Sequence, residues 1–342
     1  MRAKEVEDFS TILRQRIELV NDEIERILLE ENPFLLPRNV EYEDPVVHTL
    51  WSGGKRIRPI LCLFACDAVG GEEIKALPTA AGVEFLHTFT LVHDDVMDRT
   101  TLRRGRPSLH HLWGEPIAIT AGDTLYSLAF KSFSKNAEVE GVSDEQVRKV
   151  IEVATEKCIA LAKGQTMDIV FEGRENVDLK EYFQMVKLKT SSLLELSLEA
   201  GGIIGGGSER EIDALEKFGT FSGIAFQIQD DILDIEGKDT GKPVGTDLRR
   251  GKKTVILIHA LENADESERR RIVEFIKEKK RHVEDELANV IDTIRSIGSI
   301  EYARQLVKKT LKRAEEQLSK LKSRGGTRNL RQLVKYLMNR ER

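Results

Sequence analysis

The sequence has few of the features that mark secreted, membrane-spanning or nucleic-acid-binding proteins. Its 342 residues include three cysteines, and an odd count without a secretory pattern suits a reducing compartment. No apolar run approaches the roughly 18–20 residues that a membrane-spanning helix needs. The first residues also lack the apolar core of a signal peptide. We therefore expect a cytoplasmic protein without an integral membrane segment.

An excess of positive charge is also missing. Lys and Arg number 53 against 58 for Asp and Glu, so the formal net charge is −5. Such a chain has no overall electrostatic attraction to nucleic acid, and we expect no nucleic-acid partner. Aromatic residues make up 6% of the chain and charged residues 32%, which is typical of a helical protein with long polar faces.

Two of the cysteines lie four residues apart. Cys62 and Cys66 belong to the apolar segment 59–68, and at helical spacing they share one face. A metal-binding or redox pair is one interpretation. Buried small side chains are the favoured one, because free cysteine is among the most buried residue types.

Helical periodicity dominates the rest of the chain. Apolar residues recur at helical spacing over 8–30. Further helices are expected near 43–52, from Pro59 onward, and over 76–98, 116–136, 144–170, 179–204, 209–236 and most of 254–342. Loops are expected at 103–107, 171–178 and 237–253. Without sustained β alternation or a low-complexity linker, the sequence predicts one all-α domain spanning 1–342.

A repeated cluster of aspartates stands out against this background. The first cluster is Asp94, Asp95 and Asp98, and the second, with the same spacing, is Asp230, Asp231 and Asp234. Carboxylates gathered on one helix face repel each other and need a counter-charge. One cluster alone could be a solvated acidic turn. Two clusters, each after an apolar stretch, favour divalent cations bridged by a polyanion, and Mg²⁺ prefers such oxygen ligands.

Basic residues in several segments supply partners for such a polyanion. They are Lys55, Arg58, Arg103, Arg104, Lys189, Lys242 and Lys252, enough for more than one diphosphate group. Lys55 and Arg58 stand at the start of a helix, where the helix dipole disfavours cations. A basic surface is one interpretation, and an anion attracted to the same helix end is the favoured one. The lysine- and glycine-rich segment 237–253 lacks Walker A spacing and is expected to cover a phosphate.

The order of these motifs resembles that of the trans-isoprenyl diphosphate synthases (polyprenyl synthetases), most closely the archaeal short-chain geranylgeranyl and farnesyl diphosphate synthases. The motifs are GGKRxRP from Gly53, DDxxDxxxxRRG from Asp94, GQxxD from Gly164, KT at Lys189, FQxxDD from Phe226 and GKxxGTD from Gly241. The resemblance covers nearly the whole chain. It implies a large helical bundle with a central cavity, of the isoprenoid synthase type, and a homodimer.

The resemblance also implies a role for each matching residue. Asp94, Asp95 and Asp98 would hold two Mg²⁺ ions on an allylic diphosphate, and Asp230, with Asp231 and Asp234 nearby, would hold a third. The same diphosphate would contact Arg103, Lys189, Lys242 and Lys252, whereas isopentenyl diphosphate would contact Lys55, Arg58, His87 and Arg104. Thr190 and Gln227 would direct oxygen dipoles at the allylic carbon. Helical spacing independently places Gln227 on the face of the second cluster and His87 on that of the first, although a lone histidine is more often structural.

The implied reaction is a head-to-tail condensation. Cations stabilise pyrophosphate as it leaves dimethylallyl, geranyl or farnesyl diphosphate, and an apolar cavity protects the allylic cation from water. The double bond of isopentenyl diphosphate attacks that cation, and the adduct then loses a proton, with the departed pyrophosphate as the expected acceptor. A class I terpene cyclase is the nearest alternative, but it usually lacks the second aspartate cluster and the GGKRxRP motif. A non-catalytic metal-binding helical partner subunit is the other alternative.

Product length is expected to depend on the helix that carries the first cluster. Five positions before Asp94, about 7.5 Å along the helix axis at ~1.5 Å per residue, stands Phe89, followed by Thr90. In the family, a large aromatic residue there acts as a floor that stops chain elongation. One aromatic residue before an uninterrupted cluster resembles the enzymes that make geranylgeranyl diphosphate (C20), with farnesyl diphosphate (C15) also possible. Because Phe89 lies ~140° around the helix from Asp94, ordinary helix packing stays an alternative.

Overall fold

The computed structural model describes residues 2–35, 44–237, 244–277, 284–322 and 324–338. The chain forms two compact units, each assembled from several segments. Unit 1 comprises Met1–Thr155, Leu196–Glu216 and Lys320–Gln332, and unit 2 comprises Glu156–Glu195, Lys217–Ser319 and Leu333–Arg342. The single domain expected from the sequence stays a prediction.

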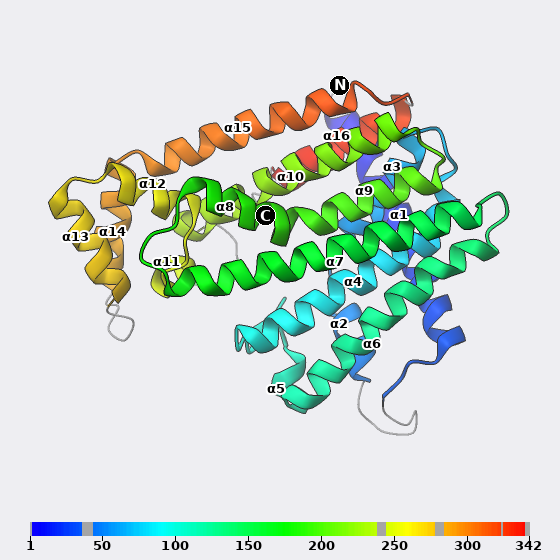
Figure 1. Ribbon diagram of the computed structural model, residues 1–342, viewed down its shortest axis with the longest axis horizontal. Helices are drawn as coiled ribbons and strands as arrows, with labels where there is room; N and C mark the ends of the chain where they lie inside the picture. The colour runs from blue at the N-terminus through cyan, green and yellow to red at the C-terminus, as the bar shows by residue number, and fades with distance from the viewer. Residues whose placement is uncertain (1, 36–43, 238–243, 278–283, 323, 339–342) are drawn as a thin grey trace. The chain divides into compact units, whose positions relative to one another are not determined.

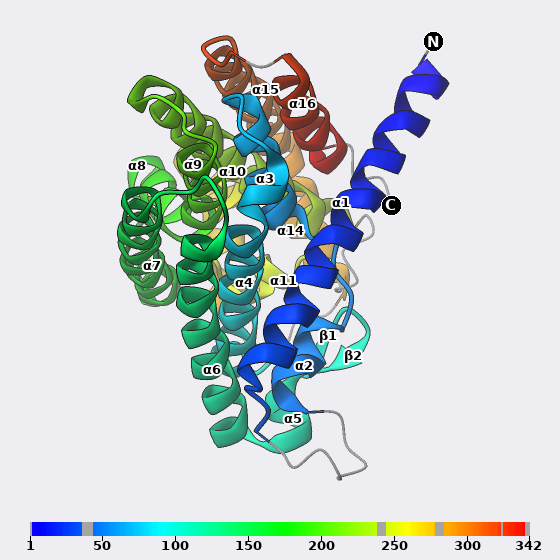
Figure 2. The same ribbon diagram turned by 90° about the vertical axis from the view of Figure 1, so that its right-hand side faces the viewer.

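Unit 1 is built around the helix that ends in the first aspartate cluster. Its elements are α1 (Arg2–Glu31), α2 (Pro45–Leu50), α3 (Ile57–Ala68), η1 (Glu73–Ala76), α4 (Leu77–Met97), β1 (Leu102–Arg103), β2 (Arg106–Pro107), α5 (Leu109–Trp113), α6 (Glu115–Ser134) and η2 (Lys135–Glu138). Four further helices each contribute a part of their length: α7 (Asp144–Gly173), α9 (Ser192–Ile204), α10 (Glu209–Glu236) and α16 (Arg324–Met338). Helices α4 and α6 lie side by side in both views (Figure 1, Figure 2).

Glycines allow close helix contacts in unit 1. A Cβ atom on Gly82 of α4 would lie 2.5 Å from the Phe133 ring of α6, and one on Gly201 of α9 would lie 2.1 Å from the Cys62 carbonyl oxygen of α3. Neither position has room for a side chain. The glycine-rich end of the segment 179–204 therefore serves packing of α9 against α3, in keeping with the absence of a phosphate-loop motif there.

Unit 2 carries the second aspartate cluster on α10. Its other elements are α8 (Leu179–Val186), a π-helical turn (Lys187–Ser191), α11 (Thr246–Arg250), α12 (Val255–Asn263), α13 (Glu266–Lys277), α14 (Glu284–Ser296) and α15 (Ser299–Leu318). Its core packs side chains from α8, α10, α12, α14 and α15 against one another. Helices α13 and α14 are neighbours in this unit (Figure 1).

The expected all-α class is confirmed, and the observed helices agree with the expected ranges to within a few residues at most ends. The segment 103–107 differs, because it forms a short β-hairpin whose turn residues, Arg104 and Gly105, both have positive φ angles (53° and 77°). That turn matches the right-handed twist of paired strands. The segment 237–253 differs as well, because its described part includes α11.

Two expectations about environment are also tested. Among the residues with described structure, no helix combines the length and apolar character needed to cross a membrane. Cys62 and Cys66 are free thiols and both are buried, and burial raises the pKa of Cys66 to about 12. The prediction that they are buried small side chains is confirmed.

A buried ion pair holds the segment that leads into α3. Arg56 has a positive φ of 47°, and its guanidinium group donates to Glu84 of α4 at 2.7 Å, to Asn21 of α1 at 2.9 Å and to the Leu50 carbonyl at 2.6 Å. The Arg56 and Glu84 side chains are only 5% and 3% exposed. Arg56 therefore anchors this segment, although the sequence groups it with the cations that were expected to face an anion.

Glu84→Ala should destabilise the protein strongly. Removing one member of a buried pair leaves the other charge without compensation, at a cost of about 3–5 kcal/mol. Chemical denaturation followed by circular dichroism measures the change. The control is Arg148→Ala in the exposed pair with Glu145 on α7, where little change is expected; similar losses in the two variants would show that the Arg56 anchor is unimportant.

Candidate active site

The first aspartate cluster stands at the C-terminal end of α4. Asp98 caps the helix, and Arg99 adopts a left-handed conformation with φ of 52°. The Thr100 amide donates to the Asp95 carbonyl at 2.9 Å and the Arg99 amide to the Val96 carbonyl at 3.3 Å, which are the two bonds of a Schellman motif. The helix dipole is negative at this end, so carboxylates there are disfavoured unless a cation binds.

The three carboxylates of this cluster differ in their surroundings. Asp95 is 3% exposed and pairs with Arg103, whose Nε lies 2.8 Å from both carboxylate oxygens and whose Nη2 lies 2.6 Å from one of them. Asp94 is half-buried and Asp98 is exposed. Arg103 thus neutralises the buried member, and Asp94 and Asp98 are the more accessible ligands for a cation.

The β-hairpin brings Arg104 to the segment before α3. Its guanidinium group donates to the Gly53 carbonyl and lies against Gly54, where a Cβ atom would come within 2.6 Å of Arg104 Nη1. Gly53 and Gly54 also have positive φ angles of 90° and 140°, which glycine adopts most readily. The absence of a side chain at Gly54 therefore makes room for the Arg104 guanidinium group. The next residue, Lys55, is exposed.

Arg58 and His87 join this basic group. Arg58 Nη1 lies 3.1 Å from His87 Nε2. Burial, and then the neighbouring Arg58 and Arg104 charges, hold the pKa of His87 well below its usual value. His87 is therefore neutral and accepts a hydrogen bond from Arg58. In unit 1, three of the four predicted ligands of isopentenyl diphosphate therefore lie close enough to interact electrostatically: Arg58, His87 and Arg104.

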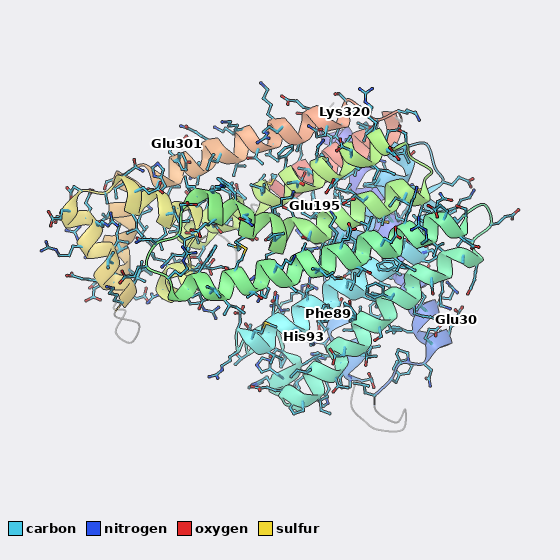
Figure 3. All side chains as sticks on the ribbon, viewed as in Figure 1. Glu30, Phe89, His93, Glu195, Glu301 and Lys320 are labelled. Carbon is cyan, nitrogen blue, oxygen red and sulfur yellow. The ribbon has the colours of Figure 1, made fainter. Side chains whose placement is uncertain are left out.

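A row of aromatic rings lies between α4 and α6. The Phe89 ring meets the His93 ring edge to face at 4.7 Å and the Tyr126 ring at 5.1 Å, and Tyr126 continues the row to Phe130 at 5.0 Å. Figure 3 shows Phe89 and His93 on the part of α4 that lies beside α6. Thr90, the other residue predicted to affect product length, donates its hydroxyl to the His87 carbonyl at 2.8 Å. Phe89 therefore belongs to an aromatic cluster, and its role in product length stays a prediction.

The second cluster is buried more deeply than the first. Asp231 and Asp234 are 2% and 8% exposed, whereas Asp230 is half-buried. Asp234 accepts from the Asp247 amide at 3.1 Å, which ties it to the first turn of α11. Burial raises the pKa of Asp231 to about 7, against the opposing effect of hydrogen bonds from Tyr182 and Gln227. Asp230 is thus the most accessible carboxylate of this cluster.

Two predicted phosphate ligands share one carboxylate. Lys189 Nζ lies 2.5 Å from Asp168 Oδ2, and Lys252 Nζ lies 3.9 Å from the same atom. Burial acts to raise the pKa of Asp168, but Lys252 and Lys189 hold it below its usual value. The ionised carboxylate keeps both ammonium groups on the wall of a small cavity in unit 2. Lys242, also predicted here, lies outside the described residues.

Lys189 and Thr190 lie on the π-helical turn, and two glycines fix its position. A Cβ atom on Gly164 of α7 would lie 2.3 Å from the Lys189 amide nitrogen, and one on Gly223 of α10 would lie 2.4 Å from Ser191 Oγ. π-Turns inside helices are frequent at functional sites. In the GQxxD motif, Gly164 thus leaves space for the π-helical turn. Asp168 supplies the negative charge that pairs with Lys189 and Lys252.

Thr190 and Gln227, the two predicted oxygen dipoles, are hydrogen-bonded to each other. Thr190 Oγ1 donates to Gln227 Oε1 at 2.8 Å, and Gln227 Nε2 donates to Asp231 Oδ1 at 3.1 Å. The second bond joins residues four apart on α10 and confirms that Gln227 shares a helix face with Asp231. Asp168 and Tyr182 were not among the predicted site residues; the GQxxD motif could have identified Asp168, whereas no sequence pattern indicates Tyr182.

The chain resembles proteins of one family over nearly its whole length. The profile of the family described as Polyprenyl synthetase matches residues 39–294. A short chain isoprenyl diphosphate synthase of Methanothermobacter thermautotrophicus is 37% identical over 332 residues, which cover 96% of this chain and 98% of the relative. The crystal structure of geranylgeranyl pyrophosphate synthetase from Pyrococcus horikoshii has a TM-score of 0.88 and 37% identity, covering 98% of this chain and 100% of that one.

A more distant structure shows what a related protein binds. Geranylgeranyl pyrophosphate synthase from Corynebacterium glutamicum, complexed with isoprenyl diphosphate and magnesium, has a TM-score of 0.82 and 26% identity, covering 95% of this chain and 98% of that one. With the fold and the motifs, these similarities define a prenyltransferase of isoprenoid biosynthesis. The chain belongs to the polyprenyl synthetase family. Within it, the chain is a short-chain prenyl diphosphate synthase with the isoprenoid synthase fold.

Gly164→Ala should displace the π-helical turn and lower prenyltransferase activity. The added Cβ atom would overlap the Lys189 backbone, and a shift of about 1 Å in a positioned group costs on the order of 100-fold in rate. Incorporation of labelled isopentenyl units measures the loss, with thermal unfolding recorded in parallel.

Gly173→Ala on the same helix is the matched control. A Cβ atom there meets nothing within 4 Å, so its activity should equal that of the wild type. Equal activity of the Gly164 and Gly173 variants would show that α7 does not fix the π-turn.

Proposed function

We propose that this chain catalyses the Mg²⁺-dependent head-to-tail condensation of isopentenyl diphosphate with dimethylallyl, geranyl and farnesyl diphosphates. The main product is geranylgeranyl diphosphate (C20), with some farnesyl diphosphate (C15). The observation that carries the proposal is the presence, in unit 1, of an acidic helix end and a basic group. Asp94 and Asp98 form the acidic end, and Arg58 and Arg104 lie in the basic group around His87. A diphosphate that carries bound metal suits the acidic helix end, and a diphosphate without metal suits the basic group.

The carboxylates present fit a hard divalent cation. Asp94 and Asp98 share a helix face at the negative end of α4 and are more accessible than Asp95, and Asp230 is the accessible carboxylate of the second cluster. Mg²⁺ prefers oxygen ligands of this kind and shares them with substrate phosphates. Bound there, Mg²⁺ would neutralise and polarise the departing diphosphate. The proposal assigns two ions to the first cluster and a third to Asp230, with Asp231 and Asp234 behind it.

The protein's own residues bind, orient and protect the reacting groups. Arg103, Lys189 and Lys252 are assigned to the departing pyrophosphate, and Lys55, Arg58, His87 and Arg104 to isopentenyl diphosphate. Thr190 and Gln227 present oxygen atoms that stabilise positive charge on the allylic carbon. A proton is then lost from the adduct to the departed pyrophosphate.

Phe89 is assigned to product length. Its half-buried ring is held by His93 and Tyr126, and a ring supported on two sides resists displacement by a growing chain.

We also propose a homodimer. Three exposed apolar side chains favour self-association: Leu112 of α5, and Ile117 and Ile119 at the start of α6. A cytoplasmic location is expected from the sequence.

Product analysis tests the function directly. The protein is incubated with Mg²⁺, labelled isopentenyl diphosphate and each allylic primer in turn, and the products are sized after removal of the diphosphate. Incorporation that ends mainly at C20 supports the proposal. A cyclic hydrocarbon without incorporation would favour a terpene cyclase, and no reaction with any primer would favour a metal-binding partner subunit.

Asp94→Ala should lower Mg²⁺-dependent turnover by on the order of 1000-fold or more, because charge stabilisation of the leaving group is a large part of catalysis. The helical circular dichroism should not change, since Asp94 lies at a helix end. Asp123→Ala, at an exposed position on α6, is the control that should keep full activity. Full activity of the Asp94 variant would reject its role as a ligand.

Phe89→Ala should shift the product distribution beyond C20. Removing the ring leaves space for further five-carbon units, so the mean length should rise by one or more units while total incorporation stays similar. Phe183→Ala on α8 removes a partly buried ring elsewhere and should leave product length unchanged. An unaltered distribution in the Phe89 variant would favour ordinary helix packing.

A further inference from the structure

Tyr182 is a fully buried residue of α8 to which no role has been assigned so far. Its hydroxyl donates to Asp231 Oδ2 at 2.7 Å, and the Val255 amide at the start of α12 donates to the same oxygen at 3.3 Å. Gln227 Nε2 donates to the other oxygen, Oδ1, at 3.1 Å. The two oxygens of Asp231 therefore accept three hydrogen bonds in all, one each from groups on α8, α10 and α12.

These bonds control the direction of the Gln227 amide. A side-chain amide can present either its oxygen or its NH₂ group to a given neighbour. Asp231 Oδ1 acts as the acceptor in this arrangement, so it selects the NH₂ group of Gln227 and turns the amide oxygen toward Thr190. Asp231 can make this selection only while its own rotation is fixed, and the short bond from Tyr182 fixes it.

We propose that Tyr182 is a positioning residue, which acts through Asp231 to hold the oxygen atoms of Gln227 and Thr190 in place. The inference rests on the proposed function, in which those oxygens stabilise positive charge on the allylic carbon. It also assigns a role to Asp231. This carboxylate is only 2% exposed, and from its buried position it orients Gln227. The lining of the unit 2 cavity includes Tyr182, Gln227 and Asp231, so the hydrogen-bond chain ends where substrate is proposed to bind.

Tyr182→Phe removes the hydroxyl and keeps the buried ring. The variant should show a kcat about three- to tenfold lower, the effect of one lost hydrogen bond on a transition-state contact. The KM for isopentenyl diphosphate and the Mg²⁺ concentration for half-maximal activity should not change, because Tyr182 touches neither. Tyr302→Phe, a partly buried tyrosine of α15 that stacks on His259, is the matched control and should behave as the wild type.

A double-mutant cycle separates positioning from general stability. In a Gln227→Leu background, Tyr182→Phe should cause little further loss of kcat, because the group that it positions is gone. Equal effects in both backgrounds, or a wild-type kcat for Tyr182→Phe, would overturn the proposal. If Tyr182→Phe does not fold, Asp231→Asn replaces it: a new NH₂ group facing Gln227 should reverse the amide and lower kcat, and a full kcat would overturn the proposal.

A readout without substrate keeps the inference independent of the assumed reaction. The side-chain amide protons of Gln227, assigned in ¹⁵N spectra by comparison with Gln227→Leu, should exchange slowly in the wild type and in Tyr302→Phe, and faster in Tyr182→Phe. Unchanged exchange in Tyr182→Phe would overturn the positioning role. A wild type without turnover but with this exchange pattern would reject the proposed function and leave the positioning of Gln227 supported.

Discussion

Repulsion among carboxylates held close together is the constraint on which this site depends. Asp94 and Asp98 stand at the negative end of α4, and Asp95 between them is compensated by Arg103. In unit 2, Asp168 is ionised in spite of its burial because Lys189 and Lys252 lie beside it. Asp95 and Asp168 are thus compensated by cations of the chain, whereas Asp94 and Asp98 are more accessible to a cation from solution.

Departures from regular helix geometry place the functional groups. α4 ends abruptly because Arg99 takes a left-handed conformation, which leaves Asp98 as the capping residue. The π-helical turn adds a residue per turn around Lys189, and Gly164 gives it the space to lie against α7. A regular helix at either place would turn these side chains to other directions. At the π-helical turn, the departure from regular geometry is accompanied by close packing against α7 and α10.

The acidic and basic motifs can be seen in the sequence, whereas the pairing of individual charges cannot. The spacing of Asp94 and Asp98, and that of Gln227 and Asp231, follows from helix geometry and could be read directly. Arg56 belongs to the same run of basic residues as Lys55 and Arg58, and nothing in that run distinguishes it. Its partner Glu84 is 28 residues away, and only folding brings the two together.

The amino-acid sequence by itself determined the helical class, the two aspartate clusters and the family, because helical periodicity and motif spacing are local along the chain. Tertiary structure decided which charges compensate each other. Asp168 meets Lys189 across 21 residues and Tyr182 meets Asp231 across 49. Such pairings depend on the packing of whole helices within each unit, and the energy of a charge depends on what surrounds it after burial. For that reason, residues of the same charge that are neighbours in the sequence have different roles in the fold, as anchors, positioning groups or candidate ligands.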